Sequence, residues 1–292
     1  MVKKPKVIVI VGPTASGKSD LAIRLAKKHK GEIISADSRQ VYRGMDIGTG
    51  KVSKQEQKKI KHHLIDVMSP KKQYTVDDFT REAEKAIKDI LKRSRLPIIV
   101  GGTGLYVDTL IYDLKYPNVP PDKKLRSELE KQTPEQLFKK LEKLDPNRAK
   151  TIEKKNKRRL IRALEIIRSL GKIPNIDVRP YHKKSKYHVI WLGLNPNNTK
   201  RRIKNRLEKR LRQGMVKEVR KLKGSGLSWK RLDSFGLEYR WIAKYLRGKV
   251  SYKEMRAGLY IDIIRYSKRQ MVWFKRNPHI HWLKNTKQMP PV

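Results

Sequence analysis

Cysteine and long apolar runs are missing from this sequence of 292 residues. The absence of cysteine excludes disulfides, a thiolate zinc site and a cysteine nucleophile. No apolar run approaches the roughly 18 residues of a membrane-spanning helix, and the one near the amino terminus is too short for a signal peptide. We therefore expect a cytoplasmic protein with no membrane partner.

Acidic residues are also scarce. The chain has 28 Asp and Glu against 72 Lys and Arg, which gives a formal net charge of +44. This charge is far above the ~2–8 that suffices to keep a small domain soluble. The basic clusters lie on segments with helical apolar periodicity, so the sequence favours a folded protein that binds a polyanion such as nucleic acid.

A glycine-bounded loop near the amino terminus has the most specific chemistry. Residues 7–11 are a β-branched run that predicts a buried strand, and the apolar positions after residue 20 predict a helix. The loop between them matches G-x-x-x-x-G-K-[ST], whose backbone N–H groups, helix dipole and lysine bind phosphate. An ordinary strand-turn-helix is the alternative. The candidate phosphate-binding residues are Gly12, Pro13, Thr14, Ala15, Ser16, Gly17, Lys18 and Ser19, with Ser19 placed to reach a magnesium ion.

Further predicted strands end in polar or glycine-rich loops. Residues 32–36 run into Asp37, and residues 96–100 run into Gly101 and Gly102. Because parallel sheets bind ligands at the carboxyl ends of their strands, we expect Asp37 near the phosphate loop. The glycine-rich stretch 41–51 is then an active-site wall rather than a plain surface loop. Residues 63–67 and 187–194 complete a predicted α/β fold with a P-loop NTPase-like parallel sheet.

The chain divides into three predicted parts. Residues 1–113 form the first part of the catalytic core, 114–186 an all-helical insertion, and 187–292 a return to the core with basic helices. Prolines mark the linker before the insertion, and Pro134 and Pro146 each open a helix. Thr199 is predicted to cap a long arginine-rich helix. For the basic run 154–159 we favour contact with a phosphate backbone over a solvated helix start.

Three functions remain compatible with these residues. A kinase would need a magnesium-binding Asp at the end of a strand; residues 96–100 end in glycines, but Asp37 could fill that role. A transferase would instead use the loop to hold a pyrophosphate leaving group, with Asp37 accepting a proton. A non-enzymatic RNA-binding module would explain the charge but leave the phosphate loop without a role.

An ordered set of motifs resembles the tRNA dimethylallyltransferases, also called tRNA isopentenyltransferases. It comprises GPTASGKS at 12–19, SADSRQVY at 35–42, GMDIGT at 44–49, HLID at 63–66, GGTGLY at 101–106, RLIRALE at 159–165 and KRQ at 268–270. Each motif alone is moderately specific, whereas the set covers nearly the whole chain in order. Without cysteine, the chain is similar to the bacterial form that has no zinc finger.

The resemblance implies transfer of a dimethylallyl group from dimethylallyl pyrophosphate to the exocyclic amine of the adenine 3′ of the anticodon. It implies Asp37 as general base, Thr14 as a catalytic residue, and Arg202, or failing that Arg206, against the leaving group. Lys18 and Ser19 would hold the pyrophosphate and its magnesium. The implied partners are dimethylallyl pyrophosphate and the tRNA anticodon stem-loop, with the protein a monomer. The implied tRNA-binding residues are Asp37, Ser38, Arg39, Gln40, Thr103, Arg126, Arg158, Arg159 and Arg162.

Overall fold

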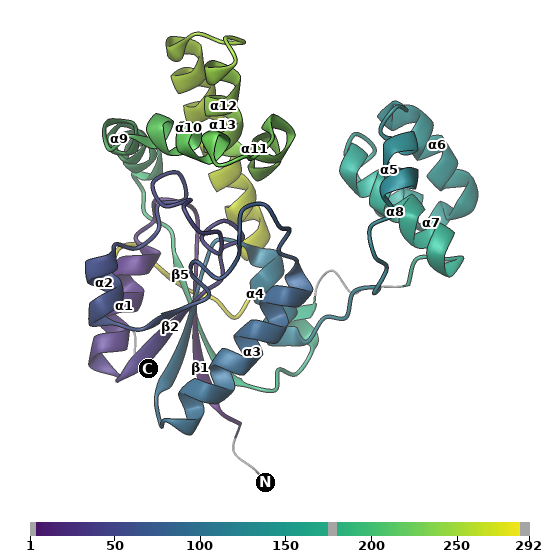
Figure 1. The fold of residues 1–292 in the computed structure, drawn as a ribbon. Coiled ribbons are helices and arrows are strands. Elements are labelled where there is room, and N and C mark those ends of the chain that lie inside the picture. The colour runs from purple at the N-terminus through teal and green to yellow at the C-terminus, as the bar shows by residue number, and fades with distance from the viewer. Residues whose placement is uncertain (1–3, 175–179, 287–292) are drawn as a thin grey trace. The chain divides into compact units, whose positions relative to one another are not determined.

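A six-stranded sheet, in which all strands run parallel, forms the centre of the larger of two compact units. The structure, a computed structural model, describes residues 4–174 and 180–286 (Figure 1). The strand order is β3-β2-β4-β1-β5-β6, which confirms the predicted α/β class. The strands are β1 (Lys6–Val11), β2 (Gly31–Ser35), β3 (His62–His63), β4 (Leu96–Val100), β5 (His188–Leu194) and β6 (His281–Leu283).

Helices cover both faces of the sheet, which is why its central strands are continuously apolar. Helix α1 (Lys18–Lys28) packs Leu21 and Leu25 against Ile8 and Ile10 of β1. Helices α3 (Val76–Lys92) and α4 (Gly104–Tyr112) lie on the other face (Figure 1). Thr75 caps α3 in a reciprocal capping box with Asp78, as the sequence predicted. A short helix, α2 (Lys54–Lys59), precedes β3.

The edges of the sheet differ from the prediction. A strand over residues 63–67 is wrong beyond His63, because Leu64 and Asp66 adopt positive φ angles of 62° and 59° and turn the chain away. His63 Nε2 lies 2.7 Å from a carboxylate oxygen of buried Glu32, so this histidine serves the structure. The opposite edge strand, β6, was not predicted, since only three residues form it.

The carboxyl-terminal part adds five helices above the carboxyl ends of the strands (Figure 1). They are α9 (Thr199–Arg212), α10 (Met215–Gly224), α11 (Trp229–Phe235), α12 (Leu237–Leu246) and α13 (Tyr252–Phe274). The prediction that Thr199 caps α9 is wrong: Asn198 is the N-cap, and the Thr199 hydroxyl donates to the Pro196 carbonyl at 2.7 Å. Within residues 4–174 and 180–286, no helix has the length and apolar character needed to cross a bilayer.

The smaller unit, residues 114–178, is helical where the structure describes it. Its helices are α5 (Lys123–Leu129), α6 (Pro134–Leu144), α7 (Pro146–Thr151) and α8 (Lys157–Leu170), and Pro134 and Pro146 are the first residues of theirs, as predicted. The predicted end of the insertion at residue 186 differs from this division. Residues 180–186, which include the short 3₁₀ helix η1 (Pro180–His182), belong to the sheet unit: the Tyr181 hydroxyl donates to Asp108 at 3.2 Å, and Lys186 pairs with Glu84.

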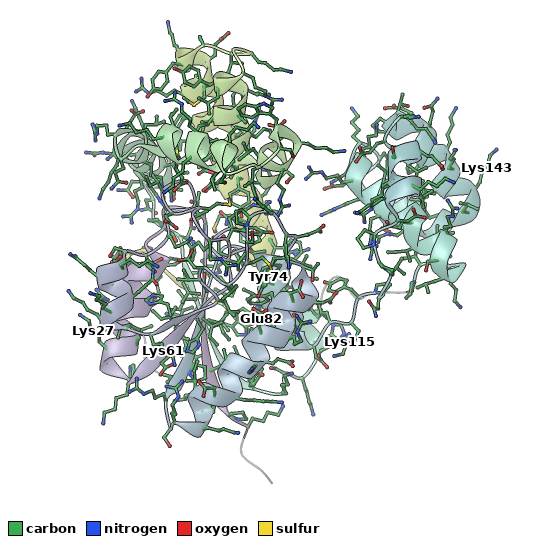
Figure 2. All side chains as sticks on the ribbon, in the orientation of Figure 1. Lys27, Lys61, Tyr74, Glu82, Lys115 and Lys143 are labelled. Carbon is green, nitrogen blue, oxygen red and sulfur yellow. The ribbon has the colours of Figure 1, made fainter. Side chains whose placement is uncertain are left out.

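Charged side chains cover the surfaces of both units (Figure 2). Lys27 and Lys61 of the sheet unit and Lys143 of the helical unit are exposed, and all three are labelled in that view. Tyr74 and Glu82, also labelled, show a different use of charge, because the tyrosine hydroxyl donates to the carboxylate at 2.8 Å and pins the loop before α3. Most of the positive charge thus remains in contact with solvent.

One buried carboxylate holds the helical unit together. Glu165 of α8 is 2% exposed and accepts the Asp122 N–H at 2.8 Å. Arg126 of α5 binds it through two nitrogens at 2.8 and 2.7 Å, and Arg162 adds a contact of 2.6 Å. These contacts lower the pKa of Glu165 against the opposing effect of burial. Its carboxylate therefore connects α5, α8 and the linker before them.

Replacing this carboxylate should loosen the helical unit. We expect Glu165→Gln to cost about 1–3 kcal/mol, because it removes the charge that two arginines face. Chemical denaturation of the full chain measures the loss in free energy of unfolding, and hydrogen exchange locates it in α5 and α8. Since the pKa is lowered on folding, the stabilisation is present above the unfolded-state pKa and disappears as the pH falls. Glu128→Gln, at an exposed position of α5, is the matched control; equal effects of the two variants would contradict this account.

Candidate active site

The loop between β1 and α1 is built in the shape that phosphate binding requires. Gly12 has φ of 140°, and a Cβ there would lie 2.5 Å from the Leu194 carbonyl oxygen of β5. The N–H of Ser16 donates to the Pro13 carbonyl at 3.3 Å and closes the turn. The loop then enters α1 at Lys18, so that the positive end of the helix dipole lies at the same place. The predicted phosphate loop is therefore present in the structure.

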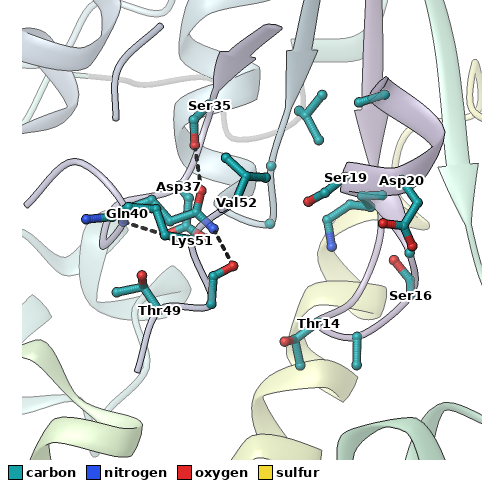
Figure 3. Close-up of a pocket in the computed structure, with 18 of the residues that line it drawn as sticks. Thr14, Ser16, Ser19, Asp20, Ser35, Asp37, Gln40, Thr49, Lys51 and Val52 are labelled. Carbon is teal, nitrogen blue, oxygen red and sulfur yellow. Dashed lines mark hydrogen bonds between the residues drawn. The ribbon is translucent and has the colours of Figure 1, made fainter. Parts of the chain in front are cut away.

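This loop forms one wall of a cavity of about 520 Å³. In Figure 3, Thr14, Ser16 and Ser19 lie on one side, while Asp37, Gln40 and Thr49 lie on the other. The second group comes from the end of β2 and from the glycine-rich stretch after it. The structure thus brings the phosphate loop, Asp37 and part of the stretch 41–51 around one space.

Lys18 is the most strongly perturbed cation of the cavity. Its Nζ donates to the Pro13 carbonyl at 2.7 Å. Burial, and after it repulsion from Arg206, lowers the pKa of Lys18 to about 7, although the Asp37 carboxylate partly opposes this shift. An anion placed against Lys18 would restore its ordinary basicity. The site therefore gains the most from a ligand with several negative charges.

Two arginines of α9 reach the phosphate loop. Arg202 Nε donates to the Ala15 carbonyl at 2.6 Å, and Arg206 Nη1 lies 3.4 Å from the Thr14 hydroxyl. Burial, followed by repulsion from Arg210, lowers the pKa of Arg206 to about 10. Both side chains line the cavity, so the geometry places both beside the position of an anion. The backbone N–H of Thr14 is taken by Gln270 at 2.8 Å, which leaves its hydroxyl to face a ligand.

Asp37 is held rigidly where β2 ends. Its Oδ1 accepts the backbone N–H groups of Arg39 at 2.8 Å and Gln40 at 3.3 Å, which forms a turn around the carboxylate. The neighbouring candidates are joined to it, because the Ser38 N–H donates to the Thr103 hydroxyl at 3.1 Å. Gln40 accepts the Ser35 hydroxyl at 3.1 Å (Figure 3). A carboxylate with a fixed direction therefore faces the cavity across from Lys18.

A magnesium ion fits this donor set only together with a ligand. Ser19 and Asp37 offer the hard oxygen atoms that Mg²⁺ prefers, and both line the cavity. Among residues 4–174 and 180–286, no group of three or more His, Cys, Asp or Glu side chains could hold a metal by itself. Oxygens of a bound pyrophosphate would have to supply further positions, as is common for Mg²⁺ sites.

The candidate arginines of the helical unit fall into two classes. Arg126 and Arg162 are engaged with Glu165, as described above. Arg158 and Arg159 are exposed at the start of α8, where Arg159 has an ion pair of 3.3 Å with exposed Glu153. Only the exposed pair is thus available for a partner without a cost in buried contacts.

Sequence reasoning missed the role of Gln270 of α13. Its Oε1 accepts the Thr14 N–H, and its Nε2 donates to the Gly102 carbonyl at 2.9 Å, so it connects the loops after β1 and β4. Tyr266, one turn earlier, also lines the cavity. A polar residue at a buried position of an otherwise apolar helix face was the available signal, because buried polar groups are nearly always bonded.

Comparisons with known proteins agree with this geometry. A family model described as IPP transferase matches residues 40–277. The chain belongs to the IPP transferase family. It is 39% identical over 284 residues to the tRNA dimethylallyltransferase of Anoxybacillus flavithermus, which covers 96% of this chain and 91% of that one. It is 41% identical over 284 residues to the enzyme of the same name from Acetivibrio thermocellus, covering 95% and 91% of the two chains.

Solved structures of IPP transferases share the fold. The tRNA isopentenylpyrophosphate transferase of Bacillus halodurans aligns with a TM-score of 0.70 and 37% identity, covering 96% of this chain and 90% of that one. A eukaryotic dimethylallyltransferase described as acting on tRNA aligns with a TM-score of 0.75 and 28% identity, covering 96% and 73%. The family resemblance expected from the motifs is therefore confirmed.

The perturbed pKa of Lys18 makes a prediction about anion binding. A bound pyrophosphate raises that pKa above about 7, so binding takes up a proton at higher pH. We expect pyrophosphate affinity to fall by up to about tenfold per pH unit above pH 7 from this residue alone. Calorimetric titration at pH 7, 8 and 9 measures the slope.

Lys18→Arg is the matched variant, because arginine stays charged across this range. Ionisation of pyrophosphate itself contributes equally to both proteins and cancels in the comparison. We expect a shallower slope for the variant; parallel slopes would show that Lys18 does not titrate on binding.

Proposed function

We propose that this chain transfers a dimethylallyl group from dimethylallyl pyrophosphate to the exocyclic amine of the adenine immediately 3′ of a tRNA anticodon. The observation that carries this proposal is the pairing of a cationic phosphate loop with a fixed carboxylate across one cavity. The family supports the reaction class, since its members named above are tRNA dimethylallyltransferases. That the acceptor is this particular adenine of the tRNA is part of our proposal.

The two sides of the cavity would act on the two ends of the reaction. The bond between the first prenyl carbon and the pyrophosphate oxygen breaks, and its electron pair leaves with pyrophosphate. The adenine amine forms the new carbon–nitrogen bond and gives up a proton to Asp37. Its lone pair is delocalised into the ring, so removal of that proton as the bond forms assists a weak nucleophile.

The leaving group would be stabilised by the cations around the phosphate loop. Lys18, Arg202 and Arg206 are fixed before the reaction and lie where negative charge grows. The Thr14 hydroxyl would donate to the same oxygens. Magnesium, held by Ser19 and the pyrophosphate oxygens, would supply further positive charge when bound. No phosphoryl group is transferred in this reaction.

tRNA would be recognised by groups of both units. Ser38, Arg39, Gln40 and Thr103 lie at the ends of β2 and β4, beside the proposed base, and would contact the extruded adenine and its neighbours. Exposed Arg158 and Arg159 would bind phosphates of the anticodon stem-loop. We further propose that the enzyme works as a monomer, because one chain supplies both the phosphate loop and Asp37 to the cavity, and that it works in the cytoplasm.

A kinase is not favoured by this site. Kinases of this fold need a carboxylate for magnesium at the end of a neighbouring strand. At the end of β4, a side chain on Gly101 would overlap the carbonyl of Ala36, the residue that follows β2, so no aspartate fits there. The homologues likewise carry the name of a prenyltransferase. The remaining carboxylate, Asp37, suits a base for an acceptor.

The reaction can be tested directly. Labelled dimethylallyl pyrophosphate, magnesium and unmodified tRNA should give labelled RNA, and nuclease digestion should place the label on the adenine beside the anticodon. Asp37→Asn should lower kcat by roughly 10²–10⁴-fold while tRNA affinity is kept. Near-normal turnover by this variant would remove Asp37 as the base. Failure of the wild-type protein to label RNA, with transfer of the γ-phosphate of ATP, would favour the kinase instead.

Binding of tRNA should depend steeply on salt. We expect Arg158→Ala combined with Arg159→Ala to weaken binding and to reduce the slope of log affinity against log salt by about 1–2. Filter binding between 50 and 200 mM salt, a range in which such contacts weaken by orders of magnitude, measures the slope. Lys27→Ala with Lys28→Ala removes equal charge from exposed positions of α1 and is the control. Equal slopes for both double variants would assign the effect to net charge alone.

A further inference from the structure

A carboxylate outside the cavity holds one of its walls. Glu218 of α10 accepts the backbone N–H groups of Asp46 and Ile47 through Oε2, at 2.8 and 2.6 Å. Its Oε1 accepts the Gly48 N–H at 3.0 Å and the hydroxyl of buried Tyr239 at 2.9 Å. Four donors therefore converge on the Glu218 side chain. Three of them belong to a stretch that lies about 170 residues before Glu218 in the chain.

The backbone N–H groups of residues 46–48 form an anion-binding concavity, and a carboxylate of the same chain occupies it. Successive N–H groups that point to one side bind phosphates and other anions in many proteins. Here Glu218 takes that place, so the stretch 46–48 cannot turn its amides elsewhere without leaving them unpaired. Hydrogen bonds to a charged acceptor are stronger than neutral ones, which makes this attachment of the stretch to α10 firm.

Residues 46–50 also contact two arginines of α9, Arg206 beside the phosphate loop and its neighbour Arg210. Arg210 Nη1 donates to the Gly48 carbonyl at 3.2 Å and pairs with Glu238 at 3.2 Å. Gly50, two residues on, packs so closely that any side chain there would overlap the guanidinium groups of Arg206 and Arg210. The backbone of residues 46–50, which Glu218 fixes, thus packs against Arg206, whose guanidinium lies beside Thr14.

We propose that Glu218 is a positioning residue for prenyl transfer: it fixes residues 46–50, and these hold Arg206 against the leaving pyrophosphate. It touches neither substrate. This inference rests on the proposed function, since Arg206 acts there on the departing group. It also predicts an effect on pyrophosphate binding that does not depend on transfer to RNA.

Glu218→Ala tests the proposal by emptying the concavity. We expect kcat for transfer to fall about ten- to a hundredfold. This loss should not exceed the one that follows from removing a side chain that itself stabilises the transition state. The KM for tRNA should stay within about twofold, because loss of an interaction made only in the transition state lowers kcat and kcat/KM equally and leaves KM unchanged. Added formate should restore part of the lost rate, since it can occupy the three vacant N–H groups. Glu208→Ala, which removes a carboxylate of α9 paired with exposed Arg256, is the control and should keep wild-type rates without a response to formate.

A second variant and a second readout keep the test decisive if the alanine variant does not fold. Tyr239→Phe removes one donor and should accelerate hydrogen exchange at the amides of residues 46–48 and weaken pyrophosphate binding. Unchanged exchange and affinity in this variant would overturn the proposal. So would a Glu218→Ala protein with wild-type kcat, or one whose loss lies in the KM for tRNA and ignores formate. If the wild-type enzyme transfers no prenyl group, the proposed function fails, while pyrophosphate affinity and exchange still decide the role of Glu218.

Discussion

Burial of several cations close together at the phosphate loop is the constraint on which the active site depends. Burial lowers the pKa of Lys18 and of Arg206 the most, and repulsion of Lys18 by Arg206 and of Arg206 by Arg210 adds to this effect. Such a cluster is stable only if the surrounding chain fixes it. Arg210 pairs with partly buried Glu238, and the loop carbonyls of Pro13 and Ala15 accept the hydrogen bonds of Lys18 and Arg202.

This constraint explains why the carboxyl-terminal helices matter to a site formed at the sheet. The phosphate loop alone supplies backbone N–H groups and one lysine. Helix α9 adds the two arginines, α13 adds Gln270 between the loops after β1 and β4, and α10 adds Glu218 under the glycine-rich stretch. In the proposed function, the charge on the departing group would therefore be met by side chains that three distant segments hold in place.

Short sequence patterns correctly predicted those elements whose conformation depends on residues close in sequence. The phosphate loop, the strand before Asp37 and the capping box at Thr75 each depend on residues close in sequence, and all three are present. The prediction of a strand beyond His63 was wrong because the apolar pattern of the sequence does not reveal the positive φ angles of Leu64 and Asp66. The bonds of Gln270 and Glu218 could not be predicted, since their partners lie 256 and about 170 residues away.

Charge in this protein serves two physically different purposes. Lys18 and Arg206 are partly buried, so their attraction for a pyrophosphate is screened less by salt than that of exposed charges. Arg158 and Arg159 are exposed, so the contact with a phosphate backbone that we propose for them would act mainly through release of counterions and would weaken with salt. Salt therefore loosens the capture of a polyanion more than it loosens the hold on the leaving group. The same net charge can thus let tRNA leave while the chemistry of the cavity stays intact.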